Sequence, residues 1–361
     1  MTSITVPRPK RQHWRSFVLA LTLGTVSCAA EPSNELGSAT TNPPQPVTTI
    51  QLPSVSPSSP TTTSFTTTSI TPTQPTTTTT EAATTTIATT TTTIAPTVAI
   101  TRYGIPVRVS GANENGWTVI DPCGDPESVS KIFPIRDVQV VLDPGHGGKD
   151  PGARGPTGLK ESEVNLEVAV AVSQLLQDEG FSTLLTRSGD YYIELDERIA
   201  LGDAANATAF ISIHHNAPTS AKSKTPGTEV FAQTGDTESA RLAGLLHKEV
   251  FEVLSDVDDV QWTSRWDAGA LRVVNSQGGD AYSLVRKPQT TNALIEIAYL
   301  ASPSEGAFIA QDGYVQLVAP PIAAAIQAFL TTDQTGTPLL ERARIHNPSG
   351  GRRTCPTVEL E

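Results

Sequence analysis

The sequence is short of basic residues, histidine and cysteine, and the first two shortages exclude classes of protein. Its 361 residues hold 25 lysines and arginines against 37 acidic residues, a net charge of −12. The first 30 residues hold four basic residues and residues 31–100 hold three acidic ones, so residues 101–361 carry −13. This charge argues against a nucleic-acid binder that works through a basic face. No His-Glu-x-x-His pattern occurs, which leaves out the metalloprotease helix with two histidine ligands on one face.

The first 30 residues are typical of a secretory signal. A basic segment is followed by Ser16 to Val26, an apolar run that is too short to predict a membrane-spanning helix. Cys28 follows Thr-Val-Ser, a pattern that resembles a lipobox with Thr25 in place of the usual Leu. We therefore expect export, either with a cleaved signal or with a lipid on Cys28 that anchors the chain to a membrane.

A threonine-rich stretch separates this signal from the rest. Residues 31–100 hold 26 Thr, 10 Pro and 8 Ser, residue types that do not build a packed core. We interpret the stretch as a disordered linker that gives reach. The 261 residues that follow are enough for one sizeable core. They divide into a small strand-rich lead-in (101–137), a main domain (138–332) and a C-terminal tail (333–361).

The few cysteines support export. There are three, and if Cys28 is lipidated or removed, Cys123 and Cys355 remain. An even pair in an exported protein predicts a disulfide, here between the lead-in and the tail. Closing so long a loop has a theoretical stabilisation of about 4–5 kcal/mol, usually less in practice. Two free thiols are the alternative.

Strands and helices alternate along the main domain. Helices of this length between strands predict an α/β fold with a mostly parallel central sheet flanked by helices. Functional groups in such sheets gather where the parallel strands end. The apolar patterns predict strands at 138–142, 181–186, 209–213, 228–232 and 292–297, and helices at 162–179, 194–206, 237–254 and 313–330.

Two of the six histidines lie just past strand ends. His146 follows the first strand in Asp-Pro-Gly-His-Gly-Gly, and His214 follows the third in Ser-Ile-His-His-Asn. With Glu161 at the start of the first helix, they form a set that can hold Zn²⁺ and leave a position for water. The alternatives are loop histidines without a metal and a glutamate that only complements the helix dipole.

Glu296 is a second unusual acidic residue. It interrupts the apolar strand Leu-Ile-Glu-Ile-Ala, where an unpaired carboxylate is costly to bury. A charge in such a position indicates a functional group. An ion pair with Arg187 or Arg272 is the alternative.

Several segments between Val138 and Leu330 resemble the zinc-dependent N-acetylmuramoyl-L-alanine amidases that trim bacterial cell walls, the amidase-3 family. They occur in the family's order and at sensible spacing. The segments are Val141–Ala153, Gly158–Glu161, Asn165–Leu166, Leu185–Arg187, Glu197–Arg198, Ser212–Ala217, Gly227–Val230 and Leu294–Glu296.

The resemblance implies a metal-assisted amide hydrolysis. His146, Glu161 and His214 would hold Zn²⁺, which would lower the pKa of a bound water towards 7 and polarise the scissile carbonyl. Glu296, the family's catalytic residue, would take the proton from this water and return it to the leaving amine. The bond cut would join N-acetylmuramic acid to the L-alanine of the peptidoglycan stem peptide. We expect this role in wall remodelling or turnover, outside the cytoplasm.

The chain also departs from the family pattern. His215 stands where the family usually has a small residue, which leaves two candidate histidine ligands, of which His214 holds the motif's place. We name Arg265, Arg272 and Asn216 as substrate contacts, the arginines for stem-peptide carboxylates. Ordinary salt bridges are the alternative for both arginines.

The stretch 256–280 bears on access to the site. Some relatives carry an extra helix that plugs the site until a partner removes it, whereas this stretch is loop-like, so we expect an open site. Trp262 and Trp266 in this stretch would stack on sugars or simply anchor the loop.

Two other functions stay open. One is a wall-binding module that keeps the fold without catalysis, although the retained ligand positions and Glu296 argue against a pure binder. The other is a zinc peptidase or deacetylase that acts on the same polymer.

Overall fold

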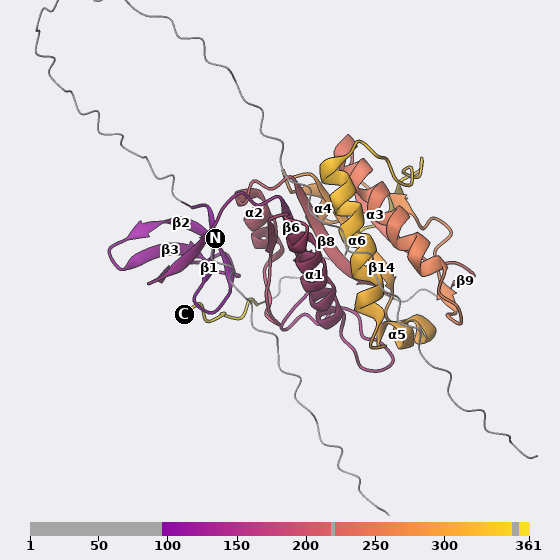
Figure 1. Ribbon diagram of the computed structural model, residues 1–361, viewed down its shortest axis with the longest axis horizontal. Coiled ribbons are helices and arrows are strands. Elements are labelled where there is room, and N and C mark those ends of the chain that lie inside the picture. The colour runs from indigo at the N-terminus through magenta and orange to yellow at the C-terminus, as the bar shows by residue number, and fades with distance from the viewer. Residues whose placement is uncertain (1–95, 218–220, 349–353) are drawn as a thin grey trace, which may run out of the picture. The chain divides into compact units, whose positions relative to one another are not determined.

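The computed structural model describes residues 96–217, 221–348 and 354–361. The predicted signal, Cys28 and nearly all of the predicted linker therefore lie outside the described residues. The described residues belong to one compact unit, which contains a small antiparallel sheet and a larger α/β arrangement (Figure 1).

The lead-in folds as an antiparallel sheet with the strand order β4-β3-β2-β1-β5. Val98, Ala99 and Ile100 pair with both β2 and β5, so the ordered chain extends into the stretch that we interpreted as linker. The strands are β1 (Val98–Thr101), β2 (Pro106–Asn113), β3 (Gly116–Ile120), β4 (Pro126–Val129) and β5 (Ile132–Ile135).

The main sheet has the strand order β12-β10-β14-β8-β6-β7. β10 runs antiparallel to β14, and the other neighbours pair in parallel. The predicted α/β fold with a mostly parallel central sheet is confirmed. The strands are β6 (Val140–Pro144), β7 (Thr183–Leu185), β8 (Ala209–Asn216), β10 (Glu229–Ala232), β12 (Ala270–Leu271) and β14 (Asn292–Tyr299).

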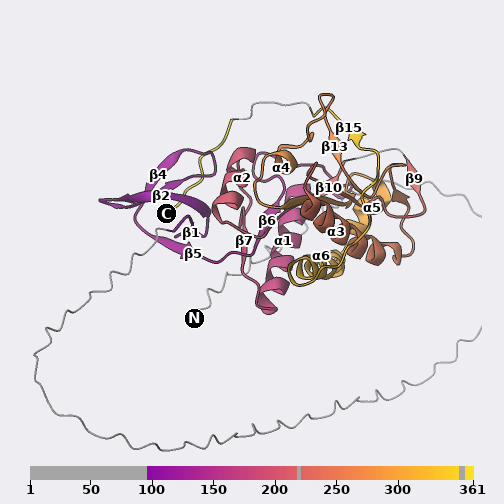
Figure 2. The same ribbon diagram turned by 90° about the horizontal axis from the view of Figure 1, so that it is seen from above.

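Helices cover both faces of this sheet (Figures 1 and 2). The larger core lies between the sheet and α1 (Glu161–Asp178), α3 (Thr237–Ser255) and α6 (Tyr314–Thr331). The opposite face packs against α2 (Leu195–Ala204) and α4 (Ser283–Arg286), and α5 (Pro303–Ile309) follows β14. By length and composition α6 could cross a membrane, but its Val318, Ile322 and Ile326 are buried in the larger core.

Local sequence sets the elements that carry the site. β6 is buried along its whole length and ends at Pro144, where Gly145 begins the glycine-rich turn. The first turn of α1 follows Lys160, whose backbone is extended. The backbone N–H of Lys160 donates a hydrogen bond to the Glu163 side chain. β8 alternates its side chains between the two faces, so His214 and His215 point to opposite sides of the sheet.

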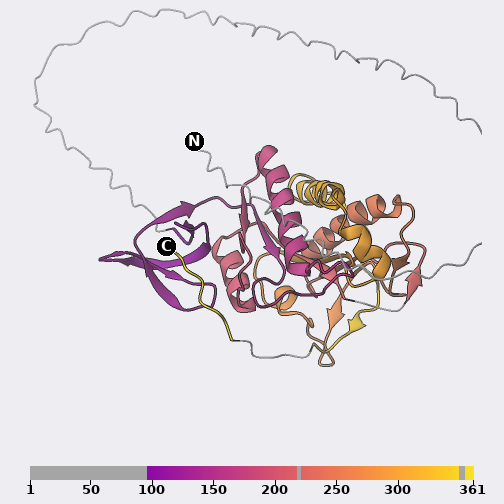
Figure 3. The ribbon, with the colours of Figure 1, turned by 90° about the horizontal axis from the view of Figure 1, so that it is seen from below.

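The C-terminal tail returns along the molecule to the lead-in. Its strand β15 (Arg344–Ile345) pairs in parallel with β13 (Val273–Val274). A separate pair, β9 (Lys222–Ser223) and β11 (Trp262–Thr263), does not involve the tail. Further along, Cys355 forms a disulfide with Cys123, and Leu360 is buried in the lead-in core. Figures 2 and 3 show the yellow C-terminal end beside the lead-in strands.

Candidate active site

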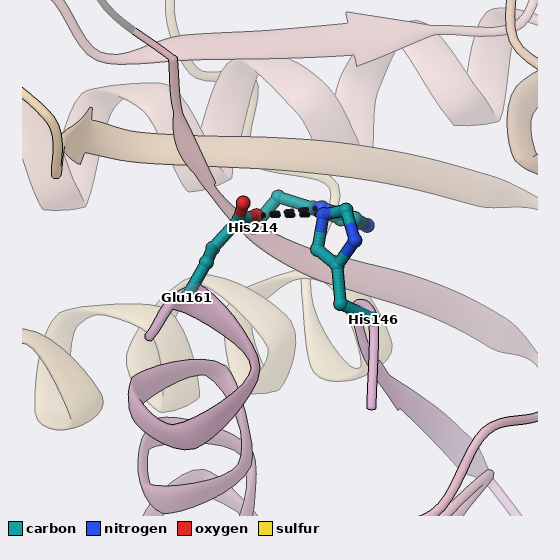
Figure 4. Close-up of side chains that lie close together, drawn as sticks. All are labelled: His146, Glu161 and His214. Atoms are coloured by element: carbon teal, nitrogen blue, oxygen red, sulfur yellow. Dashed lines mark hydrogen bonds and ion pairs between the residues drawn. The ribbon is translucent and has the colours of Figure 1, made fainter. Parts of the chain in front are cut away.

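Three of the predicted site residues meet at the carboxyl end of the main sheet. His146 comes from the turn after β6, Glu161 from the first turn of α1 and His214 from β8 (Figure 4). One Glu161 oxygen, Oε1, lies 3.1 Å from His146 Nε2 and 3.0 Å from His214 Nδ1. One ligand atom from each residue lies within 4.8 Å of the others. The structure therefore brings together the three residues named as zinc ligands.

The glycine-rich turn makes room for this cluster. A Cβ atom on Gly145 would overlap the His214 ring, and one on Gly152 would overlap the Glu161 carboxylate. His146 itself has a φ of 62°, in the left-handed region that residues other than glycine rarely adopt. The turn is thus shaped around the imidazole and carboxylate groups.

The electrostatics of the cluster favour a bound cation. Burial alone would raise the pKa of Glu161, but hydrogen bonds with His146 and His214 lower it well below its usual value. Burial alone would lower the pKa of His146, but hydrogen bonds to Asp150 and Glu161 outweigh it and raise the pKa to about 9. The carboxylate is therefore charged, and its surroundings favour a positive charge beside it.

The donor set fits zinc. Two imidazoles and one carboxylate are the protein ligands of many catalytic zinc sites, which keep a fourth position open. His214 Nε2 is buried and has no hydrogen-bond partner among the described residues, so this side chain has a donor atom left for a ligand. Within the described residues, the stretch 256–280 contributes no side chain to the cluster.

His215 holds the cluster from the opposite side of the sheet. Asn165 Nδ2 donates to Glu161 Oε1 over 3.3 Å, so the amide oxygen of Asn165 faces His215 Nδ1, 2.7 Å away. That oxygen can only accept, so Nδ1 carries the proton and Nε2 accepts from the Tyr314 hydroxyl at 2.7 Å. The fully buried His215 is thus engaged on both ring nitrogens, and the structure favours His214 as the ligand.

Glu296 lies beside the cluster on the neighbouring strand. In the register of the sheet, it pairs with His214 on β8 and with Glu229 on β10. Burial raises its pKa well above the usual value, and the negative charges of Glu161 and Glu229 add to the increase. Its Oε2 is buried without a hydrogen-bond partner among the described residues. This carboxyl group is therefore free to exchange a proton with a group in the cleft.

The predicted alternative for Glu296 finds no support. Arg187 donates its hydrogen bonds to backbone carbonyls, among them those of Pro144, Gly145 and Ser162. Arg272 donates to the carbonyl of Glu341. Both arginines thus hold the backbone instead of forming the ion pair considered for Glu296.

Comparison with known proteins identifies the domain. Residues 140–328, more than half of the chain, match the Amidase_3 family, described as N-acetylmuramoyl-L-alanine amidase. The chain belongs to this amidase family. Its members are hydrolases, and the match covers most of the predicted main domain.

The chain is also similar to individual amidases. AmiC of Neisseria meningitidis, an N-acetylmuramoyl-L-alanine amidase, is 28% identical over 219 residues, 54% of this chain and 53% of that protein. AmiA of Escherichia coli is 28% identical over 219 residues, 53% of this chain and 75% of that protein. The structure of AmiC2 of Nostoc punctiforme is 30% identical, covers 54% of this chain and 97% of its own, and has a TM-score of 0.45. This chain spans about half the length of the Neisseria relative.

A second charged group, formed by Glu229, Asp267 and Arg344, lies on the other side of Glu296. Arg344 of the tail forms a double ion pair with Glu229, with Nη2 2.7 Å from Oε1 and Nη1 2.9 Å from Oε2. It also contacts Asp267, and Asn216 Nδ2 donates to Glu229 Oε2 over 3.1 Å. Sequence reasoning missed this group. Glu229 belongs to Gly227–Val230, one of the segments that resemble the family, but no role was predicted for it. Nothing in the sequence around Arg344 linked this arginine to the site.

The predicted substrate contacts have different surroundings. Asn216 lies next to Glu229, close to Glu296. Arg265 is exposed and lines a groove with Trp266, whose side chain is 90% exposed. Arg272 is tied to the tail through the Glu341 carbonyl. Their role as substrate contacts therefore stays a prediction, and the geometry favours Asn216 and Arg265 over Arg272.

The two tryptophans of the loop also differ. Trp262 is buried and packs edge-on against Phe308, as expected of a side chain that anchors the loop. Trp266 is exposed, so its ring is accessible to a ligand.

Proposed function

We propose that this chain hydrolyses the amide bond between N-acetylmuramic acid and the L-alanine of peptidoglycan stem peptides, with zinc held by His146, Glu161 and His214. The observation that carries the proposal is the meeting of these three side chains with Glu296 at one end of the sheet. Membership of the amidase family supports the choice of bond.

The three ligand residues would hold the metal ion in one position. Zinc bound there would polarise the scissile carbonyl and make water more acidic. Glu161 is held by the backbone N–H groups of Ala153 and His215, at 2.8 and 3.1 Å, so its carboxylate is already oriented. Such support from the surrounding protein is typical of catalytic metal centres.

Glu296 would move the proton. Its unpartnered Oε2 would accept a proton from the attacking water, and the resulting carboxylic acid would donate it to the leaving amine of L-alanine.

The same proposal places the enzyme outside the cytoplasm, in the bacterial cell envelope, where its polymer lies. The signal-like residues 1–30, the threonine-rich stretch and Cys28 support export with a tether or lipid anchor. The disulfide between Cys123 and Cys355 is consistent with an oxidising compartment.

Product analysis of a wall digest tests the reaction. Purified peptidoglycan is incubated with the zinc-loaded chain, with and without a chelator, and the soluble products are identified by mass spectrometry. We expect stem peptides with a free N-terminal L-alanine, only without chelator. Released acetate would instead indicate a deacetylase, and shortened stems a peptidase. Wall binding without any product would indicate a binding module.

A further inference from the structure

The C-terminal tail supplies an arginine that forms ion pairs with two carboxylates next to Glu296. Arg344 lies 16 residues beyond the end of the family match at residue 328, on the short strand β15. Its backbone N–H donates to the Arg272 carbonyl over 2.9 Å, and that of His346 donates to the Val274 carbonyl over 2.8 Å. The tail backbone is thus fixed at Arg344 and two residues beyond it.

The guanidinium of Arg344 joins two carboxylates from separate segments. It contacts both oxygens of Glu229 on β10. It also contacts both carboxylate oxygens of Asp267, through Nε at 2.8 Å and Nη2 at 2.7 Å, and the Asp267 carbonyl at 3.0 Å. The side chain of Glu229 is only 1% exposed, so without Arg344 its charge would be buried with Asn216 as its one remaining side-chain partner among the described residues.

Glu229 is also the direct cross-strand neighbour of Glu296. Side chains that face each other in this way lie close enough to interact. Because Arg344 and Asn216 bond both Glu229 oxygens, the Glu229 carboxylate is held in place and its charge is balanced by the guanidinium. Glu296 is then the free carboxyl group of the pair.

Asp267 connects Arg344 to the groove lined by Arg265 and Trp266. It directly follows Arg265 and Trp266, the exposed residues of the groove. Two bonds from one guanidinium to Asp267 fix this segment against the tail.

We propose that Arg344 is a positioning residue of the site: it holds and neutralises Glu229 beside Glu296, and it fixes the Arg265–Asp267 segment of the groove. The proposal rests on the proposed amidase function for its kinetic consequences. It predicts two separate effects, one on kcat through Glu229 and one on KM through Asp267.

The test compares Arg344→Met, Arg344→Lys, the double variant Glu229→Gln/Arg344→Met and the control Arg342→Met in the full chain. Arg342 is an exposed arginine of the same tail. For Arg344→Met we expect kcat to fall about tenfold or more and KM to rise several-fold, with zinc affinity unchanged. Arg344→Lys should be intermediate, because an ammonium cannot form two double pairs. The double variant should recover most of kcat, since no unpaired carboxylate remains beside Glu296, but not KM, because Asp267 has still lost Arg344.

Hydrogen exchange gives a readout that needs no amidase activity. Amides of residues 264–274 should exchange faster in Arg344→Met than in the parent or in Arg342→Met. If the parent releases no stem peptide, the proposed function fails while this comparison still decides the role of Arg344. Parental exchange in Arg344→Met would overturn the proposal. So would equal kinetic effects in Arg344→Met and Arg342→Met, or a double variant that recovers neither constant.

Discussion

Glu296 lies between two charged groups that are assembled in different ways. On the metal side, His146, Glu161 and His214 all come from within the family match and sit directly at the ends of regular elements. On the tail side, Glu229 and Asp267 are joined by Arg344, which lies beyond that match. The residues of the metal side thus all lie within the family match, whereas the tail side depends on Arg344, which lies beyond it.

Each side also rests on a buried histidine. His215 supports the metal side through Asn165, and His247 of α3 supports the tail through the Thr337 hydroxyl, 2.9 Å from its Nδ1. Burial lowers the pKa of each to about 4. Both imidazoles are therefore neutral near pH 7, and each serves as a hydrogen-bonding spacer. Because the two sides rest on different residues, we expect that each can be weakened without the other.

The largest effect is expected from removing a metal ligand. His214→Ala leaves only two ligand residues, so zinc binding and activity should be lost together, with a rate decrease beyond the 10- to 100-fold that is typical for outer partners of a metal site. Metal analysis of the purified protein and the wall digest measure this. His346→Ala, an exposed histidine of the tail, serves as control and should keep both. A His214→Ala variant with a full zinc content would contradict the assignment.

The next effect concerns the far anchor of the tail. The double variant Cys123→Ser/Cys355→Ser opens a loop with a sequence separation of 232 residues. We expect the free energy of unfolding to fall by about 2–4 kcal/mol in denaturant titrations. Zinc affinity should stay at the parental value, because the metal side does not depend on the tail. A loss of zinc affinity equal to that of a ligand variant would break the separation between the sides.

A smaller effect is expected from acidification. The folded pKa of His247 is about 4, against an ordinary value of 6.5, so the unfolded chain takes up its proton first as the pH falls. The contribution of His247 is complete above pH 6.5 and is lost as the pH falls from 6.5 to 4. His247→Gln should therefore reduce the stability difference between pH 7 and pH 5 by about 2 kcal/mol. Urea unfolding at the two pH values checks this, and an unchanged difference would show that His247 is not buried as a neutral ring.

The smallest effect is expected behind the metal side. Tyr314→Phe removes the hydroxyl that donates to His215 Nε2. Tyr314 is connected to the proposed zinc ligand Glu161 only through His215 and Asn165. We expect zinc affinity to fall about tenfold, the lower end of the range for such outer partners, with little change in KM. Competition with a chromophoric chelator measures it, and Tyr103→Phe, on an exposed tyrosine, is the matched control. Equal zinc affinities in the two variants would show that the chain from Tyr314 to Glu161 does not support the metal.

The metal side could be predicted from the sequence because it follows local rules. Val140–Leu142 and Phe210–Ile213 are apolar runs that end in polar residues, and the ends of parallel strands share one edge of a sheet. His146 and His214 were therefore expected at one edge of the sheet once the strands were recognised. The resemblance to the amidases added their roles.

The tail side could not be predicted, for physical reasons. β10 and β12 run antiparallel to the other four strands of the sheet, and only the observed register makes Glu229 the neighbour of Glu296. Arg344 contacts Glu229 across 115 residues, from a strand of two residues that has no pattern of its own. The short strands β1, β4 and β5 were missed for the same reason, since few residues carry little periodicity.

The central claim is that zinc and Glu296 together cut the bond to L-alanine. One paired measurement tests it directly: the zinc content of the parent and of Glu296→Gln, and the rate at which each releases stem peptides from peptidoglycan. We predict the same zinc content in both proteins and a release rate roughly 10²- to 10⁴-fold lower in Glu296→Gln. A Glu296→Gln protein that releases stem peptides with N-terminal L-alanine at the parental rate would contradict the account.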